Sequence, residues 1–166
     1  MSAGGSRRFD SSVQAETEQG VLKMLNEQVT LDRQVESAKG AVVMQPDFNT
    51  RDAFRIFDID QKGTLSAADI KYGLADMGVH VTAEDVDLFV QRHDKNRDGR
   101  LDYREFAEAF TPQDPYYASI LARRPGSQRR VNPYRKDDLF SHSTACTFKE
   151  LFRTMLSTEG SAEATR

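Results

Sequence analysis

Residues 94–105 read DKNRDGRLDYRE, a run of oxygen-bearing side chains around one glycine, and they give the strongest structural signal in the chain. The candidate ligands in it share an oxygen donor and are Asp94, Asn96, Asp98, Arg100 (through its carbonyl), Asp102 and Glu105. A hard cation such as Ca²⁺ takes roughly six to eight oxygen ligands, so they must converge from alternate positions of a tightly turned loop. Gly99 permits that turn, because glycine adopts positive φ angles without strain. The pattern D-x-[DN]-x-[DN]-G-x5-E is matched at every specified position and predicts one Ca²⁺ site.

Residues 58–69 read DIDQKGTLSAAD and repeat this arrangement with poorer donors. The candidate ligands here are Asp58, Asp60, Thr64, Ser66 and Asp69. Lys62 places an ammonium at the fifth position, where an oxygen is expected. Asp69 is one methylene shorter than Glu, so a bidentate contact needs a tighter loop, which suits Mg²⁺ with its bonds of about 2.0–2.1 Å. We expect this loop to be a weak metal site, to hold Mg²⁺, or to be empty.

Apolar residues at helical spacing flank both loops. These residues are Phe54, Phe57, Ile70, Leu74, Met77, Val86, Phe89, Val90, Phe106, Ala109 and Phe110. The i, i+3, i+4 spacing predicts four short helices, one on each side of each loop. Leu65 and Leu101 both occupy the eighth loop position, where we expect a short strand pairing between the loops.

Residues 48–112 resemble the calmodulin-like EF-hand family, most specifically through residues 94–105. The resemblance implies an all-α fold with one paired EF-hand lobe, extended by helices at its N- and C-terminal ends. It also implies a lobe that binds Ca²⁺ and offers an apolar groove to a partner helix. The ligand roles of the family carry over to the six residues of the second loop and the five of the first. Lys62 departs from the family pattern, and so does His93, where the family usually has an apolar residue.

Residues 1–47 form an N-terminal arm with a predicted amphipathic helix over residues 17–40. Its apolar positions are spaced alternately by three and four, as in a heptad seam, with one polar interruption at Gln28. The candidate docking residues in this seam are Val21, Met24, Leu31 and Val35. Such a helix gains most of its stability from packing, so we expect it to lie on the lobe, on a second copy or on another protein. Gly40 and Pro46 mark its expected end.

Residues 113–166 form a tail with nine basic and six acidic side chains, whereas residues 48–112 carry nine and thirteen. We predict a short helix over residues 115–124, a basic stretch, and an amphipathic helix over residues 148–157. Thr147 and Glu150 have the spacing of a capping box at the start of that last helix. Its apolar face consists of Phe148, Leu151, Phe152, Met155 and Leu156. This helix either folds back into the groove of the lobe or docks on a neighbouring protein.

Several classes of function are disfavoured by the composition. The single cysteine leaves no internal disulfide, which is typical of a reducing compartment, and no apolar run approaches the ~20 residues that span a bilayer. The sequence has no secretory leader, no myristoylation signal and no catalytic signature, so we expect a cytoplasmic protein that is not an enzyme. The basic stretch of the tail is weak evidence for nucleic acid binding. A solvated linker is favoured first, and then contact with an acidic protein surface such as tubulin.

Two functions are compatible with this organisation. The protein is either a structural subunit that clamps helices of a large assembly around one Ca²⁺ ion, or a free calmodulin-like sensor that exposes its groove on Ca²⁺ binding. We favour the first, because one loop is degraded and the arms make up more than half of the chain. The whole chain is also similar, more loosely, to EF-hand proteins of protist ciliary axonemes, through residues 45–49, 52–55, 114–118 and 123–125. That similarity implies a cytoskeletal, ciliary microtubule setting, with tubulin or axonemal proteins as partners.

Overall fold

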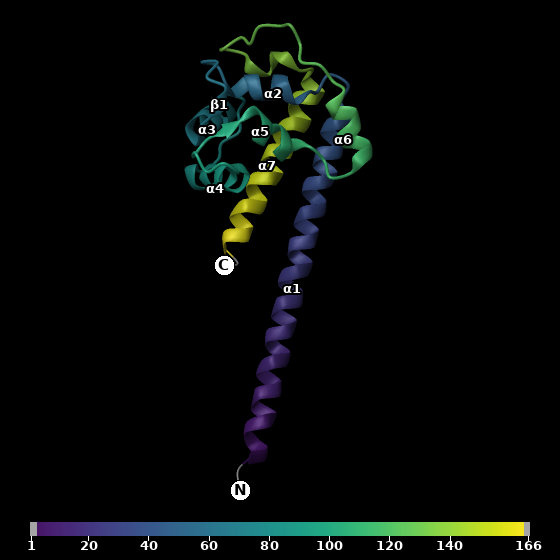
Figure 1. Ribbon diagram of the computed structural model, residues 1–166, viewed down its shortest axis with the longest axis vertical. Helices are drawn as coiled ribbons and strands as arrows, with labels where there is room; N and C mark the ends of the chain where they lie inside the picture. The colour runs from purple at the N-terminus through teal and green to yellow at the C-terminus, as the bar shows by residue number, and fades with distance from the viewer. Residues whose placement is uncertain (1–2, 165–166) are drawn as a thin grey trace.

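The computed structural model describes the backbone of residues 3–164 and the side chains of residues 13–158 apart from residue 137. The helices are α1 (Ala3–Val43), α2 (Thr50–Phe57), α3 (Ala67–Asp76), α4 (Ala83–His93), α5 (Tyr103–Phe110), α6 (Pro115–Ala122) and α7 (His142–Ala164), with a short 3-10 turn at Lys136–Leu139. Two short strands, β1 (Thr64–Leu65) and β2 (Leu101–Asp102), complete the secondary structure. Figure 1 shows a lobe of short helices, with α7 running past them and α1 extending far below. None of the helices in residues 3–164 is long and apolar enough to cross a membrane.

Two helix–loop–helix units form the lobe. Helices α2 and α3 flank the first loop, and α4 and α5 flank the second. Strands β1 and β2 pair antiparallel with Leu65 opposite Leu101, as the sequence predicted, and both leucines are fully buried. The expected all-α fold is thereby confirmed, with one paired lobe and a helical extension at each end.

The four helices of the two units each begin at a side-chain cap. Asn49, Ser66, Thr82 and Asp102 each accept a hydrogen bond from the backbone N–H three residues later. Such a cap typically contributes about 1 kcal/mol. Ser66 and Asp102 are also the ninth residues of the two loops, so the end of each loop is the start of the helix that follows it.

Helix α7 fills the groove between the two units. The ring centroid of Phe152 lies 5.0 Å from that of Phe110 and 5.5 Å from those of Phe57 and Phe89. The five apolar residues predicted to form one face of this helix are at most 3% exposed. Of the two alternatives considered for this helix, the structure shows the fold-back onto its own lobe.

Helix α7 is longer than the predicted range of residues 148–157, and it begins six residues earlier. The Ser141 hydroxyl accepts a hydrogen bond from the Thr144 N–H at 3.3 Å, which caps the first turn. Thr147, the expected cap, lies inside the helix, and its hydroxyl donates to a carbonyl one turn earlier. The prediction was wrong because the start is fixed from a distance: Asp47 accepts the Ser141 N–H at 2.6 Å, a contact that local spacing cannot reveal.

Helix α1 extends well beyond the predicted range of residues 17–40. Its 41 residues correspond to a length of about 60 Å at 1.5 Å per residue. Val42 and Val43 are buried against the lobe, and the helix continues through Gly40, which lies against the ring of Tyr117. The apolar seam therefore marked the part of the helix that can pack, while the polar N-terminal part remains helical without that signal.

The tail is tied to the lobe rather than solvated throughout. Helix α6 ends at Ala122, two residues before the predicted end, and Arg124 then donates to the carbonyls of Gln45 and Phe48 at 2.7 and 3.1 Å. Lys136 forms an ion pair with Asp76 of α3. Two cations of the predicted basic linker are thus engaged within the chain.

Candidate metal centre

The second loop is wound so that its acceptor side chains turn inward. Asp94, at the end of α4, accepts hydrogen bonds from the N–H groups of Asp98 and Gly99 at 3.2 and 2.7 Å. Asn96 accepts from the Asp98 N–H at 3.0 Å. This winding requires positive φ angles of 61° at Arg97 and 81° at Gly99. The glycine was expected from the sequence, whereas the left-handed conformation of Arg97 was not.

Glu105 joins the two ends of the second loop. One of its carboxylate oxygens accepts from the N–H groups of Lys95 and Asn96 at 2.9 and 3.2 Å, and the other accepts from Asp102 at 3.0 Å. The Asp102 carboxylate in turn accepts a hydrogen bond from the Glu105 N–H at 2.8 Å, which caps α5. Glu105 is only 6% exposed, so its carboxylate is directed into the loop rather than into solvent.

The donor set of the second loop fits a hard cation in kind and in order. Asp94, Asn96, Asp98, Asp102 and Glu105 supply side-chain oxygens, and Arg100 supplies a carbonyl. Among the described side chains, those of residues 13–158 apart from residue 137, no three carboxylate, His or Cys groups are gathered closely enough to hold a metal ion. The carboxylates of Asp94, Asp98 and Glu105 also accept hydrogen bonds from backbone N–H groups of the loop, which fixes their positions. A Ca²⁺ ion in this loop would be held by these oxygens.

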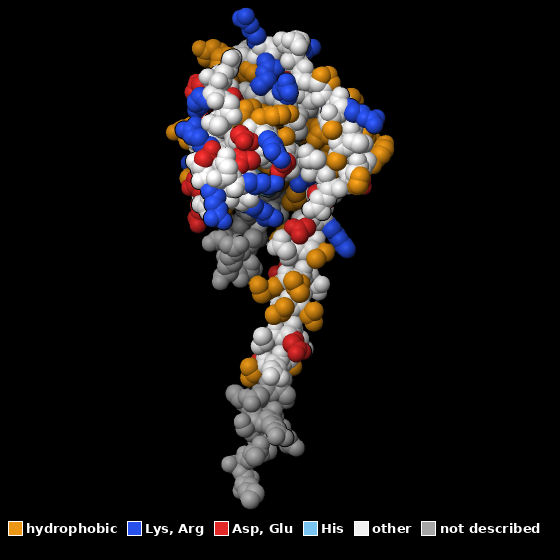
Figure 2. All heavy atoms as spheres, viewed as in Figure 1, with side chains coloured by type: hydrophobic (Ala, Val, Ile, Leu, Met, Phe, Trp, Pro, Cys, Tyr) orange, Lys and Arg blue, Asp and Glu red, His pale blue; other side chains and the backbone are white. Residues whose placement is uncertain are grey.

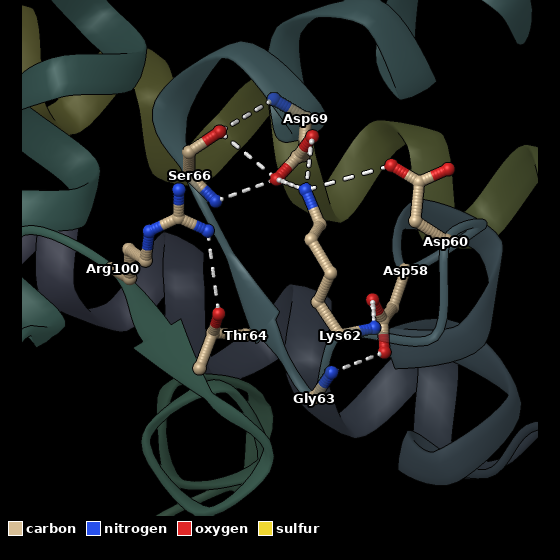
Figure 3. A network of polar contacts seen from close by, with 8 residues as sticks. All are labelled: Asp58, Asp60, Lys62, Gly63, Thr64, Ser66, Asp69 and Arg100. Atoms are coloured by element: carbon tan, nitrogen blue, oxygen red, sulfur yellow. Dashed lines mark hydrogen bonds and ion pairs between the residues drawn. The ribbon is translucent and has the colours of Figure 1, made fainter.

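The first loop has the same winding, and the ammonium group of Lys62 lies among its carboxylates (Figure 3). Asp58 accepts from the N–H groups of Lys62 and Gly63 at 2.8 and 2.9 Å, and φ is 79° at Gly63. The Lys62 ammonium lies 3.2 Å from a carboxylate oxygen of Asp69. That same oxygen accepts hydrogen bonds from the N–H and the hydroxyl of Ser66, both at 2.9 Å. Asp69 is therefore already satisfied by an ammonium, a hydroxyl and a backbone N–H.

Arg100 and Thr64, the seventh residues of the two loops, face each other. The Arg100 guanidinium donates to the Thr64 hydroxyl at 3.4 Å. Only the carbonyl of Arg100 was assigned a role from the sequence. The Arg100 side chain reaches from the second loop to the first, so the Thr64 hydroxyl of the first loop is also hydrogen-bonded to the second loop.

His93 packs inside the lobe just before the second loop. Its ring centroid lies 4.7 Å from that of Phe89. Burial lowers the pKa of His93 to about 4, and the nearby positive charges of Arg92, Lys39 and Lys95 act in the same direction. The residue is therefore neutral near pH 7 and serves in packing as the apolar residue of the family pattern would.

The candidate docking residues fall into two groups. Phe148, Leu151, Phe152, Met155 and Leu156 are buried within their own lobe. On α1, Leu31 and Val35 are half-buried near the lobe, whereas Val21 and Met24 are 49% and 48% exposed. Of these candidate docking residues, those on the outer part of α1 are exposed and open to another molecule.

One functional cluster escaped the sequence analysis. The buried carboxylate of Asp52 accepts from the Arg55 guanidinium at 3.0 Å and from the Ser127 N–H at 3.1 Å. Arg55 also donates to the Ser127 carbonyl at 3.1 Å, so α2 holds the tail in place. Asn49-x-x-Asp52 carried a visible cap signal, but no local pattern indicated a contact with a residue 75 positions away.

Comparison with known proteins agrees with this geometry. The family model for an EF-hand domain pair matches residues 48–111. Calmodulin-like protein 6 of Oryza sativa subsp. japonica is 39% identical over 56 residues, which cover 34% of this chain and 33% of the relative. Calmodulin-like protein 9 of Arabidopsis thaliana is 37% identical over 57 residues, covering 34% and 38%. Calglandulin of Bothrops insularis is 34% identical over 65 residues, covering 39% and 42%.

The centre of the chain is therefore an EF-hand pair, and it is similar to the EF-hands of calmodulin-like proteins. The chain spans about a third of the length of the calmodulin-like relatives that it matches. Helices α1 and α7 both lie wholly outside the residues that the family model matches.

Proposed function

We propose that this protein binds one Ca²⁺ ion in its second loop and acts as a structural and regulatory subunit of a larger cytoskeletal assembly. It would do so by docking a helix of another protein on the outer part of α1. The observation that carries this proposal is that α7 occupies the groove of the lobe, while apolar side chains of α1 lie exposed beyond the lobe.

The filled groove favours the structural subunit over the free sensor. A calmodulin-like sensor works by exposing an apolar groove when Ca²⁺ binds. Here Phe148 and Phe152 of α7 already pack among rings of α2, α4 and α5. A partner helix would have to displace five buried apolar residues of α7, and burial of one such side chain contributes about 1.5–3 kcal/mol.

The outer part of α1 offers an alternative docking surface, which we call the α1 stripe. It consists of Val13, Val21, Leu22, Met24, Leu25 and Val29, each between 46% and 59% exposed. Figure 2 shows orange patches of hydrophobic side chains along α1 below the lobe, with acidic side chains among them. The stripe continues the seam through which Val35 packs against the lobe, so it prolongs an existing helix interface.

Charge selects the kind of partner for the α1 stripe. Residues 13–32 carry four acidic side chains and one lysine. A second copy would bring like charge against like charge, which disfavours pairing of two α1 helices. We therefore propose a helix of another protein, apolar on one face and basic along its edges. The sequence resemblance to axonemal EF-hand proteins is the basis for placing this partner in a ciliary microtubule assembly in the cytoplasm. An axonemal protein is the candidate for the α1 stripe, because the acidic surface expected of tubulin would suit the basic tail instead.

Dye fluorescence and co-purification distinguish the proposed structural subunit from a free calcium sensor. On Ca²⁺ addition, fluorescence of an apolar dye should change little, because the groove is filled, and calorimetry should register one ion per chain. A large Ca²⁺-dependent rise in dye fluorescence would instead support the sensor. Co-purification with the assembly should be lost in Leu22→Glu/Leu25→Glu and kept in Tyr72→Glu, which alters an exposed side chain on α3. Partner binding that survives the double substitution would contradict docking on the α1 stripe.

A further inference from the structure

The first loop contains a cation that belongs to the chain itself. The Lys62 Nζ atom lies 3.2 and 3.4 Å from the two carboxylate oxygens of Asp69 and 3.7 Å from one of Asp60. Asp60 and Asp69 are the third and twelfth residues of the loop, so the ammonium joins its two ends (Figure 3). The side chain of Lys62 is 38% exposed, and these contacts with Asp60 and Asp69 place its ammonium over its own loop at the surface.

The loop around Lys62 keeps the conformation of the second loop. The fourth and sixth residues have φ angles of 55° and 79° in the first loop and of 61° and 81° in the second. The first residue of each loop, Asp58 or Asp94, accepts hydrogen bonds from the N–H groups of the fifth and sixth residues. A lysine in place of an oxygen donor has therefore left the winding intact.

We propose that the Lys62 ammonium takes the place of a divalent cation in the first loop and keeps that loop wound in the absence of metal. Asp58, Asp60 and Asp69 are like charges within one short loop, and a cation between them offsets their repulsion. An ammonium carries three N–H donors and no acceptor, which suits a ring of oxygens. A divalent ion needs the same oxygens at about 2.0–2.6 Å, so the ammonium also excludes it. This inference does not require the second loop to bind Ca²⁺.

The consequence lies in the pairing of the loops. Strand β1 of the first loop pairs with β2 of the second, with Thr64 opposite Asp102. A first loop that stays wound without metal presents a formed β1 to the second loop before any ion arrives. Removing such a conformational requirement raises apparent affinity, because less of the binding free energy is used for ordering.

Amide hydrogen exchange at two glycines tests the proposal in the full chain. Gly63 and Gly99 donate equivalent hydrogen bonds, at 2.9 and 2.7 Å, to the first aspartate of their loops, and both are exposed. In EDTA, Gly63 should exchange about tenfold more slowly than Gly99, because the Lys62 ammonium pairs with two carboxylates of its own loop. In Lys62→Met, Gly63 should exchange as fast as Gly99 does. Lys71→Met makes the same change on an exposed face of α3 and should leave Gly63 as in the wild type.

Equal exchange of the two glycines in the wild-type chain in EDTA would overturn the proposal, and so would an unchanged Gly63 in Lys62→Met. Added Ca²⁺ should slow exchange at Gly99 and leave Gly63 within about twofold of its rate in EDTA. A Gly99 amide that ignores Ca²⁺ would refute the calcium function proposed above, while the comparison in EDTA would still decide the role of Lys62.

Metal stoichiometry tests the exclusion of a divalent ion. Asp69→Glu alone should bind one Ca²⁺ per chain, like the wild type, because Lys62 still occupies the first loop. Lys62→Asp combined with Asp69→Glu restores oxygen donors at the fifth and twelfth positions and should bind one ion more. A gain of an ion in Asp69→Glu alone, or no gain in the double variant, would contradict the assignment of Lys62 as the occupant.

Discussion

Replacing Phe152 by Ala measures how firmly α7 is held in the groove. Phe152 is fully buried, with the rings of Phe57, Phe89, Phe110 and Phe148 at 5.0–5.5 Å. Truncation of a buried Phe costs about 3–5 kcal/mol, including the cavity that it leaves. The rings around this cavity come from four helices, α2, α4, α5 and α7, which cannot all move in to close it. We therefore expect a loss in the upper half of the range, about 4–5 kcal/mol.

The assay is urea unfolding in EDTA, followed by circular dichroism, for Phe152→Ala and for Leu22→Ala. Leu22 lies on the α1 stripe and is 59% exposed, so its truncation should change the free energy of unfolding by about 0.5 kcal/mol or less. A loss below about 1.5 kcal/mol for Phe152→Ala would mean that α7 does not depend on the groove for its place. The groove would then be available to a partner helix, and the result would favour the calcium sensor over the structural subunit.

Three further predictions follow from the geometry. Glu105→Gln removes the charge of the carboxylate that joins the ends of the second loop, so Ca²⁺ affinity measured by calorimetry should fall by at least about tenfold; an unchanged affinity would place the ion elsewhere. Burial tends to raise the pKa of Asp47, but hydrogen bonds led by that from the Ser141 N–H outweigh it and lower the pKa below its ordinary value of 3.8. The wild type should therefore be more stable than Asp47→Asn at pH values above 3.8, and this difference in the free energy of unfolding should vanish as the pH falls below 3.8. Urea unfolding across pH measures the difference, and a difference that persists in acid would rule this out. Arg55→Met should destabilise the fold by about 1–3 kcal/mol and expose the tail to trypsin, since buried Asp52 loses its cation and the tail loses a tether; resistance equal to that of the wild type would refute this role.

The loops and their flanking helices were predictable because their signals are local. The alternation of oxygen donors and a glycine at the sixth position set the winding of residues 94–105, and apolar residues at helical spacing set the helices around it. The pairing of Leu65 with Leu101 followed from their equal loop positions. The residues that set each loop lie within a dozen positions of one another, and the pairing of the two loops follows because the same pattern occurs twice.

Features set by distant contacts were not predictable in this way. The start of α7 depends on Asp47, and the course of the tail depends on Asp52 and Arg55. The sequence showed that Lys62 offers no oxygen ligand to a metal ion. Its contact with Asp69, however, depends on the side chain folding back over the loop. The length of α1 was underestimated because its first turns, before the apolar seam that begins at Val21, have few apolar residues at helical spacing.

The rod-like form of α1 places the α1 stripe at a distance from the ion. Residues 3–30 would span about 40 Å at 1.5 Å per residue, measured outward from the edge of the lobe. A reorientation of the lobe by about 5° would then move the far end of this rod by about 3.5 Å, roughly two-thirds of the height of a helical turn. A slight tilt of the lobe would thus displace the N-terminal end of α1 far enough to change the register of a partner helix bound there.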